Sequence, residues 1–101
     1  MGKERPQRLG RKLAAIRKQL ELSQNEMVRR LGLSDKLTRE EVSAYERSVR
    51  DPSLPTLLRY AKVAGVWIDV LVDDDLDLPK EIPCPTKSEG IRRRAAKSKR
   101  R

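Results

Sequence analysis

The sequence contains no histidine, no phenylalanine and only one cysteine, Cys84, in 101 residues. Without histidine there is no imidazole for acid–base chemistry near neutral pH, and the common Cys/His zinc sites are excluded. A single cysteine forms no disulfide within the chain, so we interpret Cys84 as a free thiol in a reducing compartment. The sequence also has no phosphate-binding glycine loop and no nucleophile–base pair. It therefore predicts no enzyme, no metal and no other cofactor.

Aromatic side chains and long apolar runs are also scarce. Aromatic residues make up 3% of the chain, and no apolar run is long enough to span a bilayer or to act as a signal peptide. A core built from Leu, Ile, Val, Ala and Met favours small helices over a β-sandwich. The length leaves room for one domain. We expect a cytoplasmic all-α protein that does not contact a membrane.

The net charge of +9 is distributed unevenly along the chain. Residues 1–68 carry 15 basic and 8 acidic side chains, whereas residues 69–81 carry 1 and 6, and residues 87–101 carry 8 and 1. A basic protein attracts phosphate polymers such as nucleic acids, although basic proteins without such partners are also common.

Apolar spacing and a capping box predict the first two helices. Apolar residues at 9, 13, 16 and 20 share one helical face, which predicts a helix over 9–20. Ser23, with Glu26 three residues later, is a capping box that begins a second helix. Gly32 is typical of the residue that follows a helix, so the second helix ends just before it.

The remaining elements follow from similar signals. Thr38 and Glu41 form a second capping box, which begins a third helix that runs to about Val49. Pro55 suits the first turn of a fourth helix. Residues 66–72 form a short fifth apolar segment whose β-branched residues would also suit a strand. With short connections, five helices form a compact orthogonal bundle.

These signals divide the chain into four segments. Prolines discourage regular structure after the fifth segment, and the last residues are too polar to form a core. The segments are a flexible arm over 1–8, the helical domain over 9–72, a solvated acidic linker rich in proline over 73–86, and a disordered basic tail over 87–101.

Three motifs resemble the phage repressor/Cro-type helix-turn-helix family, often called XRE-like. They are the runs RKQLELSQ over 17–24, VSAYER over 42–47 and DPS over 51–53 with TLLRYA after it. The resemblance covers about Leu9 to Val72. It implies a lambda-repressor-like fold and sequence-specific binding of double-stranded DNA by a transcriptional regulator, most simply a repressor, in the cytoplasm and on the nucleoid of a bacterial or phage-type system.

One departure from the family concerns the connection between the second and third helices. An ungapped match would bury Thr38 and Glu41, which is costly for polar side chains. Four extra residues within 34–38 instead place Val42 and Tyr45 inward. The sequence therefore predicts a longer turn than the family usually has, and the tilt of the third helix stays open.

The third helix is the candidate for reading DNA bases. Its exposed stripe holds four residues at helical offsets 0, 3, 4 and 7, namely Glu40, Ser43, Ala44 and Arg47. The opposite, buried stripe holds Val42, Tyr45 and Val49. Arg47 can pair with guanine and Glu40 with cytosine, and Arg39 could reach a base or a phosphate. The alternative is an ordinary solvated helix face.

Other residues are candidates for supporting roles. The resemblance implies that Gln24 contacts a phosphate and that Arg17 and Glu46 form an ion pair that orients the third helix, although each could be an ordinary surface residue. Weaker phosphate candidates, each equally explained by solvation, are Asn25, Lys36 and Arg50. Trp67 and Val70 could form a homodimer interface or belong to the core.

Two further segments leave alternatives open. An antitoxin-like or other interaction module could dock a partner protein through residues 76–85. The basic tail could add nonspecific phosphate contacts or simply be solvated. The acidic run over 73–77 begins like a calcium loop but has Leu78 where that loop needs glycine, so a calcium site is excluded.

Overall fold

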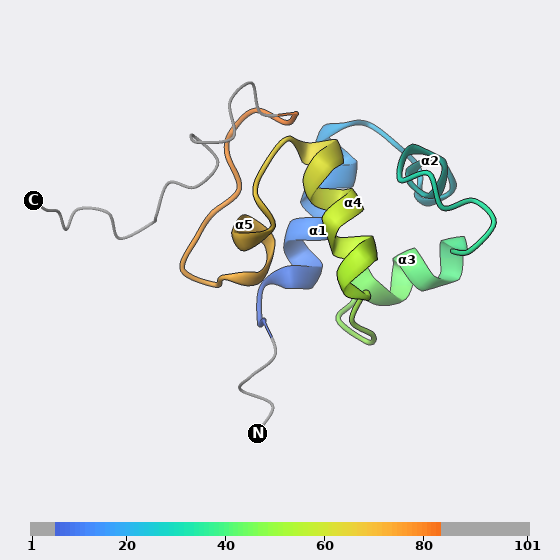
Figure 1. Cartoon of the computed structure of the whole chain (residues 1–101), viewed down its shortest axis with the longest axis horizontal. Coiled ribbons are helices and arrows are strands. Elements are labelled where there is room, and N and C mark those ends of the chain that lie inside the picture. Colours follow the sequence, from blue (N-terminus) through green and yellow to red (C-terminus); the bar gives the residue numbers. More distant parts are fainter. Residues whose placement is uncertain (1–5, 84–101) are drawn as a thin grey trace, which may run out of the picture.

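The computed structural model describes residues 6–83, which contain five α-helices (Figure 1). The helices are α1 (Leu9–Gln19), α2 (Gln24–Arg30), α3 (Arg39–Glu46), α4 (Leu54–Ala64) and α5 (Ile68–Val72). The fold class is therefore all-α, as predicted, and the fifth segment is a helix and not a strand. The interpretations of Cys84 and of the basic tail lie outside the described residues. None of the described helices has the length and apolar character needed to cross a membrane.

Both predicted capping boxes are present. At the start of α2, the Ser23 hydroxyl accepts a hydrogen bond from the Glu26 N–H at 3.0 Å, and the Glu26 carboxylate accepts one from the Ser23 N–H at 2.7 Å. Thr38 and Glu41 make the same pair of bonds at the start of α3. Because each box satisfies backbone groups that a helix end leaves free, the sequence locates these two starts well.

The predicted end of α3 is wrong. The helix stops at Glu46, and Ser48 adopts a left-handed backbone conformation with φ of 62°. That conformation turns the chain away from the helix axis. Val49 therefore points into solvent with 64% of its surface exposed, and does not join Val42 and Tyr45 in the buried stripe.

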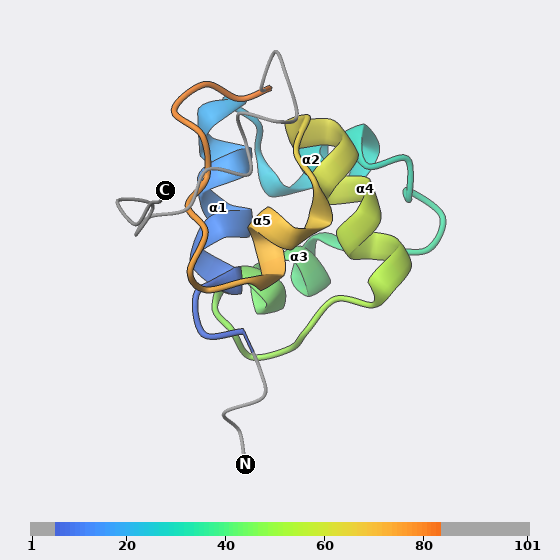
Figure 2. The same cartoon turned by 60° about the vertical axis from the view of Figure 1, so that its left-hand side comes forward.

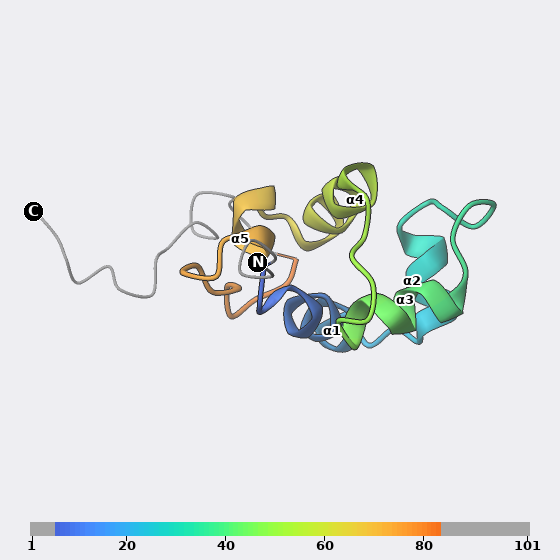
Figure 3. The same cartoon turned by 90° about the horizontal axis from the view of Figure 1, so that it is seen from below.

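The core gathers apolar side chains from all five helices. Its fully buried members include Leu13, Ile16, Met27, Leu31, Val42, Tyr60, Val70 and Leu71. The α1 helix contacts both α3 and α5, so it links the two ends of the domain. At one end lie α2 and α3, and at the other lie α5 and the segment that follows it (Figure 3).

The segment after α5 is not the solvated linker that its charge and prolines predict. We call its described part, residues 73–83, the strap. It runs back along α1 (Figure 2), and Leu76 and Ile82 are 1% and 8% exposed within the core. Burial of these two apolar side chains outweighs the acidic character of their neighbours.

Polar contacts join the strap to the segment before α1. The Asp74 carboxylate accepts hydrogen bonds from the N–H groups of Gln7 and Arg8 at 2.8 and 3.0 Å. The Arg8 guanidinium donates to the carbonyls of Asp74 and Leu76 and pairs with Asp77. The sequence places Gln7 and Arg8 in a flexible arm, but these hydrogen bonds hold both residues on the domain.

Lys12 is the most buried charged residue at this end, with 4% of its surface exposed. Its ammonium donates to the Val70 carbonyl at 2.7 Å and to the Asp73 carbonyl at 3.0 Å. Burial lowers the pKa of Lys12, and the neighbouring Arg8 acts in the same direction. The side chain thereby satisfies carbonyls at the C-terminal end of α5, which a helix leaves without partners.

Candidate nucleic-acid interface

The α3 helix is held from behind by apolar packing and by a close approach of α1. Val42 and Tyr45 are 0% and 7% exposed and face the core, as predicted. A Cβ atom built on Gly10 would lie 2.9 Å from the carbonyl oxygens of Tyr45 and Glu46 and 2.5 Å from Ser48 Oγ. Only glycine lets α1 come this close to the C-terminal end of α3.

The ion pair that the family resemblance implies is present between α1 and α3. Arg17 Nε lies 2.7 Å from Glu46 Oε2, and a second guanidinium nitrogen lies 3.0 Å from Oε1. The two side chains are only 16% and 7% exposed. The hydrogen bond to Glu46 raises the pKa of Arg17, whose guanidinium also donates to the Leu22 carbonyl. A bidentate, largely buried pair of this kind restricts the orientation of α3.

Gln24 joins the same cluster. Its side-chain amide donates to Glu46 Oε1 at 3.2 Å, which places the residue between α2 and α3. The family resemblance implies that Gln24 contacts a phosphate, which stays a prediction. In the structure the Gln24 amide contacts the carboxylate that Arg17 also binds, so α1, α2 and α3 meet at one acidic side chain.

The opposite face of α3 presents polar and small side chains to solvent. Glu40 and Arg47 are exposed, whereas Ser43 and Ala44 are partly buried between them. Arg47 is the residue that follows the helix, and its Nε donates to Ser43 Oγ at 3.2 Å. Arg39 lies 3.4 Å from Glu40 at the start of the helix. The predicted stripe therefore exists, with Arg47 at its end and not within a helical turn.

The longer connection between α2 and α3 forms a turn with its own anchors. Leu37 is buried and Leu33 is half-buried, and the N–H groups of Lys36 and Leu37 both donate to the Leu33 carbonyl at 2.9 Å. Residues 34–36 are exposed. The extra residues therefore project beside the start of α3 without shifting Val42 out of the core.

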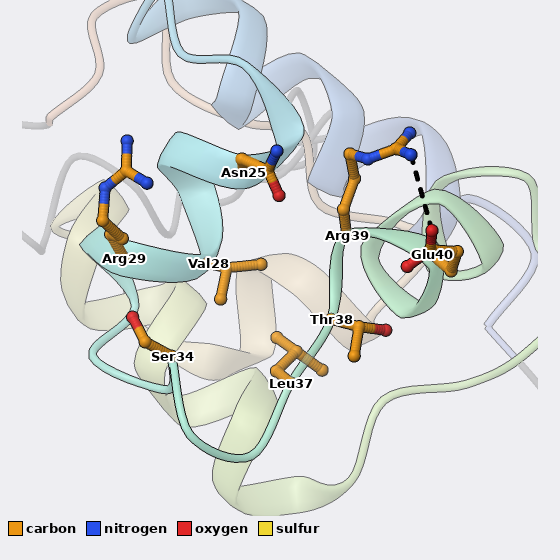
Figure 4. Close-up of a pocket in the computed structure, with 8 residues that line it drawn as sticks. All are labelled: Asn25, Val28, Arg29, Ser34, Leu37, Thr38, Arg39 and Glu40. Carbon is orange, nitrogen blue, oxygen red and sulfur yellow. Dashed lines mark hydrogen bonds and ion pairs between the residues drawn. The ribbon is translucent and has the colours of Figure 1, made fainter.

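This turn encloses a surface hollow, which we call the α2–α3 hollow (Figure 4). Its volume is about 440 Å³. Eight residues line it, namely Asn25, Val28, Arg29, Ser34, Leu37, Thr38, Arg39 and Glu40. Asn25, one of the predicted phosphate contacts, is thus brought beside Arg39 and Glu40. The other two, Lys36 and Arg50, are exposed and do not line the hollow.

The two candidates for a dimer interface, Trp67 and Val70, differ in solvent exposure in the structure. Val70 is fully buried, so its assignment to an interface is wrong, and core packing explains its apolar character. Trp67 remains 48% exposed and lies near the end of the domain that α5 occupies. Other large apolar residues with substantial exposure are Leu54, Leu58 and Val72.

The sequence did not identify several residues that make important contacts or line the hollow in the structure. Gly10 could have been noticed, because glycine in the first turns of a helix lowers its stability and needs a packing reason. Lys12 and Arg29 carry no comparable signal, since a basic residue on a helix is usually solvated. The hollow depends on how the inserted turn folds, which no local pattern specifies.

Comparison with known proteins gives one match. A sequence model of the helix-turn-helix family matches residues 13–71, which extend from the middle of α1 to α5. No curated protein and no solved structure matches the chain. Within residues 6–83, no group of three or more acidic or cysteine side chains is placed to hold a metal ion.

Proposed function

The chain belongs to the helix-turn-helix family of the phage repressor/Cro type, a family of DNA-binding transcription regulators, and we propose that it reads a specific duplex sequence with α3 in the major groove. One observation carries this proposal. The α3 helix is fixed from behind by Tyr45 and by the Arg17–Glu46 pair, while its other face stays open to solvent. A rigid helix with one free polar face suits the width of the major groove.

The side chains on that face suggest distinct roles. Ser43 and Ala44 are short, so the helix backbone can approach the base edges closely. Arg47 is long and exposed, and its weak bond to Ser43 can be exchanged for the paired acceptors of guanine. Glu40 can accept from cytosine, and Arg39 can reach a base or a phosphate at the start of the helix.

Phosphate contacts would fix the register of the protein on the duplex without reading sequence. We assign them to exposed residues on either side of α3, namely Asn25, Lys36 and Arg50, and to Gln24. Gln24 differs from the others because its amide already bonds Glu46. A phosphate contact from Gln24 would thus connect the DNA backbone to the group that orients α3.

The simplest regulatory outcome is repression, in which the bound protein occludes a promoter. Trp67 offers exposed apolar area for a homodimer, and a two-fold dimer would read half-sites about one helical turn apart. Analytical ultracentrifugation should then show dimers on DNA. Exclusively monomeric protein at micromolar concentration, with and without DNA, would rule the dimer out.

The alternative of a partner-binding module is less well supported. It requires the segment from residue 76 onward to be available to another protein. Leu76 and Ile82 are instead buried against the chain's own core. A partner docking there would have to displace the strap.

Selection of bound sequences from random duplex DNA at physiological salt tests the proposed function. We expect one enriched motif, and we expect Arg47→Ala to lose preference at one guanine of that motif. Lys62→Ala is the matched control, because Lys62 is an exposed cation on α4, away from the α3 stripe. Enrichment of no motif by the folded wild type would contradict sequence-specific binding.

A further inference from the structure

The α2–α3 hollow combines an apolar floor with cationic walls. Val28 and Leu37 are 6% and 7% exposed and form the floor. Arg29 lies on the α2 side and Arg39 at the start of α3 (Figure 4), and the only acidic residue that lines the hollow is Glu40. The cationic side chains therefore outnumber the acidic ones, which favours an anionic occupant.

Both arginines have capacity for another partner. Arg39 contacts Glu40 only at 3.4 Å, and the two side chains are 53% and 75% exposed. An exposed pair with this spacing contributes little free energy and exchanges readily. The Arg29 guanidinium is exposed and makes no hydrogen bond or ion pair within residues 6–83, and its charge reaches Glu26 only as the weakest of the effects on the pKa of that carboxyl. A guanidinium that is not bonded to a carboxylate suits recognition of a phosphate.

The hollow is continuous with the proposed DNA-reading face. It shares Glu40 with the α3 stripe, and it includes Arg39 and Asn25, which are already proposed to contact a base or a phosphate. An anionic polymer that follows α3 would therefore pass its opening. The turn that carries Ser34 forms the far wall, so the extra residues between α2 and α3 create the hollow.

We infer that the α2–α3 hollow holds one backbone phosphate of the bound duplex, which Arg29 and Arg39 grip from opposite sides with the Ser34 hydroxyl as a further donor. This inference rests on the proposed function, and it assigns a role to the inserted turn. Arg29 is then a positioning contact that adds affinity equally for every sequence, because phosphates are the same at each base pair.

The salt dependence of duplex binding tests the inference. A plot of log affinity against log salt concentration has a negative slope, and each phosphate contact makes that slope steeper by about 0.9. We expect Arg29→Ala to flatten the slope by about that amount and to weaken binding roughly three- to tenfold at physiological salt. Arg30→Ala is the matched control, since Arg30 is the next exposed arginine of α2 and does not line the hollow.

A scan with single neutral methylphosphonates along the selected duplex identifies the phosphate. At one position, neutralising the phosphate should remove most of the difference in duplex affinity between the wild type and Arg29→Ala. Such non-additivity is the signature of a direct contact between Arg29 and that phosphate. Equal slopes for Arg29→Ala and Arg30→Ala, or additive effects at every phosphate, would overturn the inference. The proposed function would still stand in that case, because selection of a motif by the wild-type protein does not depend on a phosphate contact from Arg29.

Discussion

The two ends of α1 contact the rest of the domain through two cations of different character, the partly buried Arg17 and the buried Lys12. Arg17, towards the C-terminal end, binds a carboxylate of α3, and its hydrogen bond to Glu46 raises its pKa. Lys12, towards the N-terminal end, binds only carbonyl oxygens near the end of α5, and burial lowers its pKa. One cation bonds directly to an opposite charge, whereas the other bonds to backbone carbonyls and is also attracted by the nearby carboxylates of Asp73, Asp74 and Asp77.

The two cations therefore have different structural roles. Arg17 orients α3, whereas Lys12 holds α5 and the strap against α1. At the α3 end, a bidentate pair constrains the direction of the helix that we propose reads DNA. At the α5 end, Lys12 closes the domain against the strap, and none of the proposed DNA contacts lies there. Substitutions at the two ends should therefore separate loss of DNA affinity from loss of stability.

The largest combined effect is expected for Glu46→Ala. This substitution leaves the mostly buried Arg17 without its carboxylate, and breaking such a pair costs about 3–5 kcal/mol of unfolding free energy. The freed α3 should also bind the selected duplex more than tenfold more weakly. Urea unfolding and fluorescence anisotropy measure the two effects. Full affinity in the folded fraction of the variant would show that the pair does not orient α3.

Lys12→Ala should affect stability almost alone. The truncation leaves the Val70 and Asp73 carbonyls without their donor and opens space in the domain, which costs about 2–4 kcal/mol. Affinity of the folded protein for DNA should match that of the wild type. Arg11→Ala is the control, because Arg11 is exposed on the same helix. If Arg11→Ala and Lys12→Ala unfold at the same urea concentration, Lys12 is not a structural contact.

Gly10→Ala tests the junction between the two ends. The added methyl group must push α1 from α3, because it would lie within 2.9 Å of two carbonyl oxygens, and overpacking of this kind costs about 1–3 kcal/mol. DNA affinity should fall with it as α3 tilts. Ser48→Gly removes the hydroxyl that lies 2.5 Å from the new methyl position, and it also suits the left-handed torsion angle of residue 48, so it should stabilise Gly10→Ala more than it stabilises the wild type. An equal gain in stability from Ser48→Gly in the wild type and in Gly10→Ala would show that the Ser48 hydroxyl does not clash with the added methyl group.

The smallest effect concerns pH at the strap. Hydrogen bonds from the Gln7 and Arg8 N–H groups lower the pKa of Asp74, so the folded state favours its carboxylate. The stabilisation is complete above the ordinary pKa of an aspartate and is lost as the pH falls through the lowered value in the folded state. We expect Asp74→Asn to lower the melting temperature by a few degrees at pH 7, and we expect this difference to shrink below about pH 3. A difference independent of pH would argue against the carboxylate's role.

Local signals in the sequence predicted the helices well. The capping boxes of α2 and α3 are short-range patterns, so the residues that form them also identify them. The end of α3 was predicted less well, because Ser48 takes a left-handed conformation that sequence patterns expect of glycine. That single torsion angle moves Val49 from the buried stripe to the surface.

Features that depend on tertiary contacts could not be predicted from local patterns, and the Arg17–Glu46 pair was expected only because the family resemblance implies it. The acidic charges and prolines after α5 indicate a solvated linker, yet Leu76 finds a place in the core that no local pattern reveals. Lys12 resembles any helical lysine until the carbonyls of α5 are placed beside it. The α3 stripe was predicted as a set of residues, but the hollow beside it required the fold of the inserted turn.

The most direct test of the comparison between the two ends is a titration of the ¹⁵N-labelled protein with the selected duplex, followed by amide chemical shifts. We predict that the largest changes fall on residues 39–47 and around the α2–α3 hollow, and that the amides of Lys12 and the strap change little. Large changes confined to α5 and the strap, with α3 unaffected, would contradict the claim that this chain reads DNA with α3.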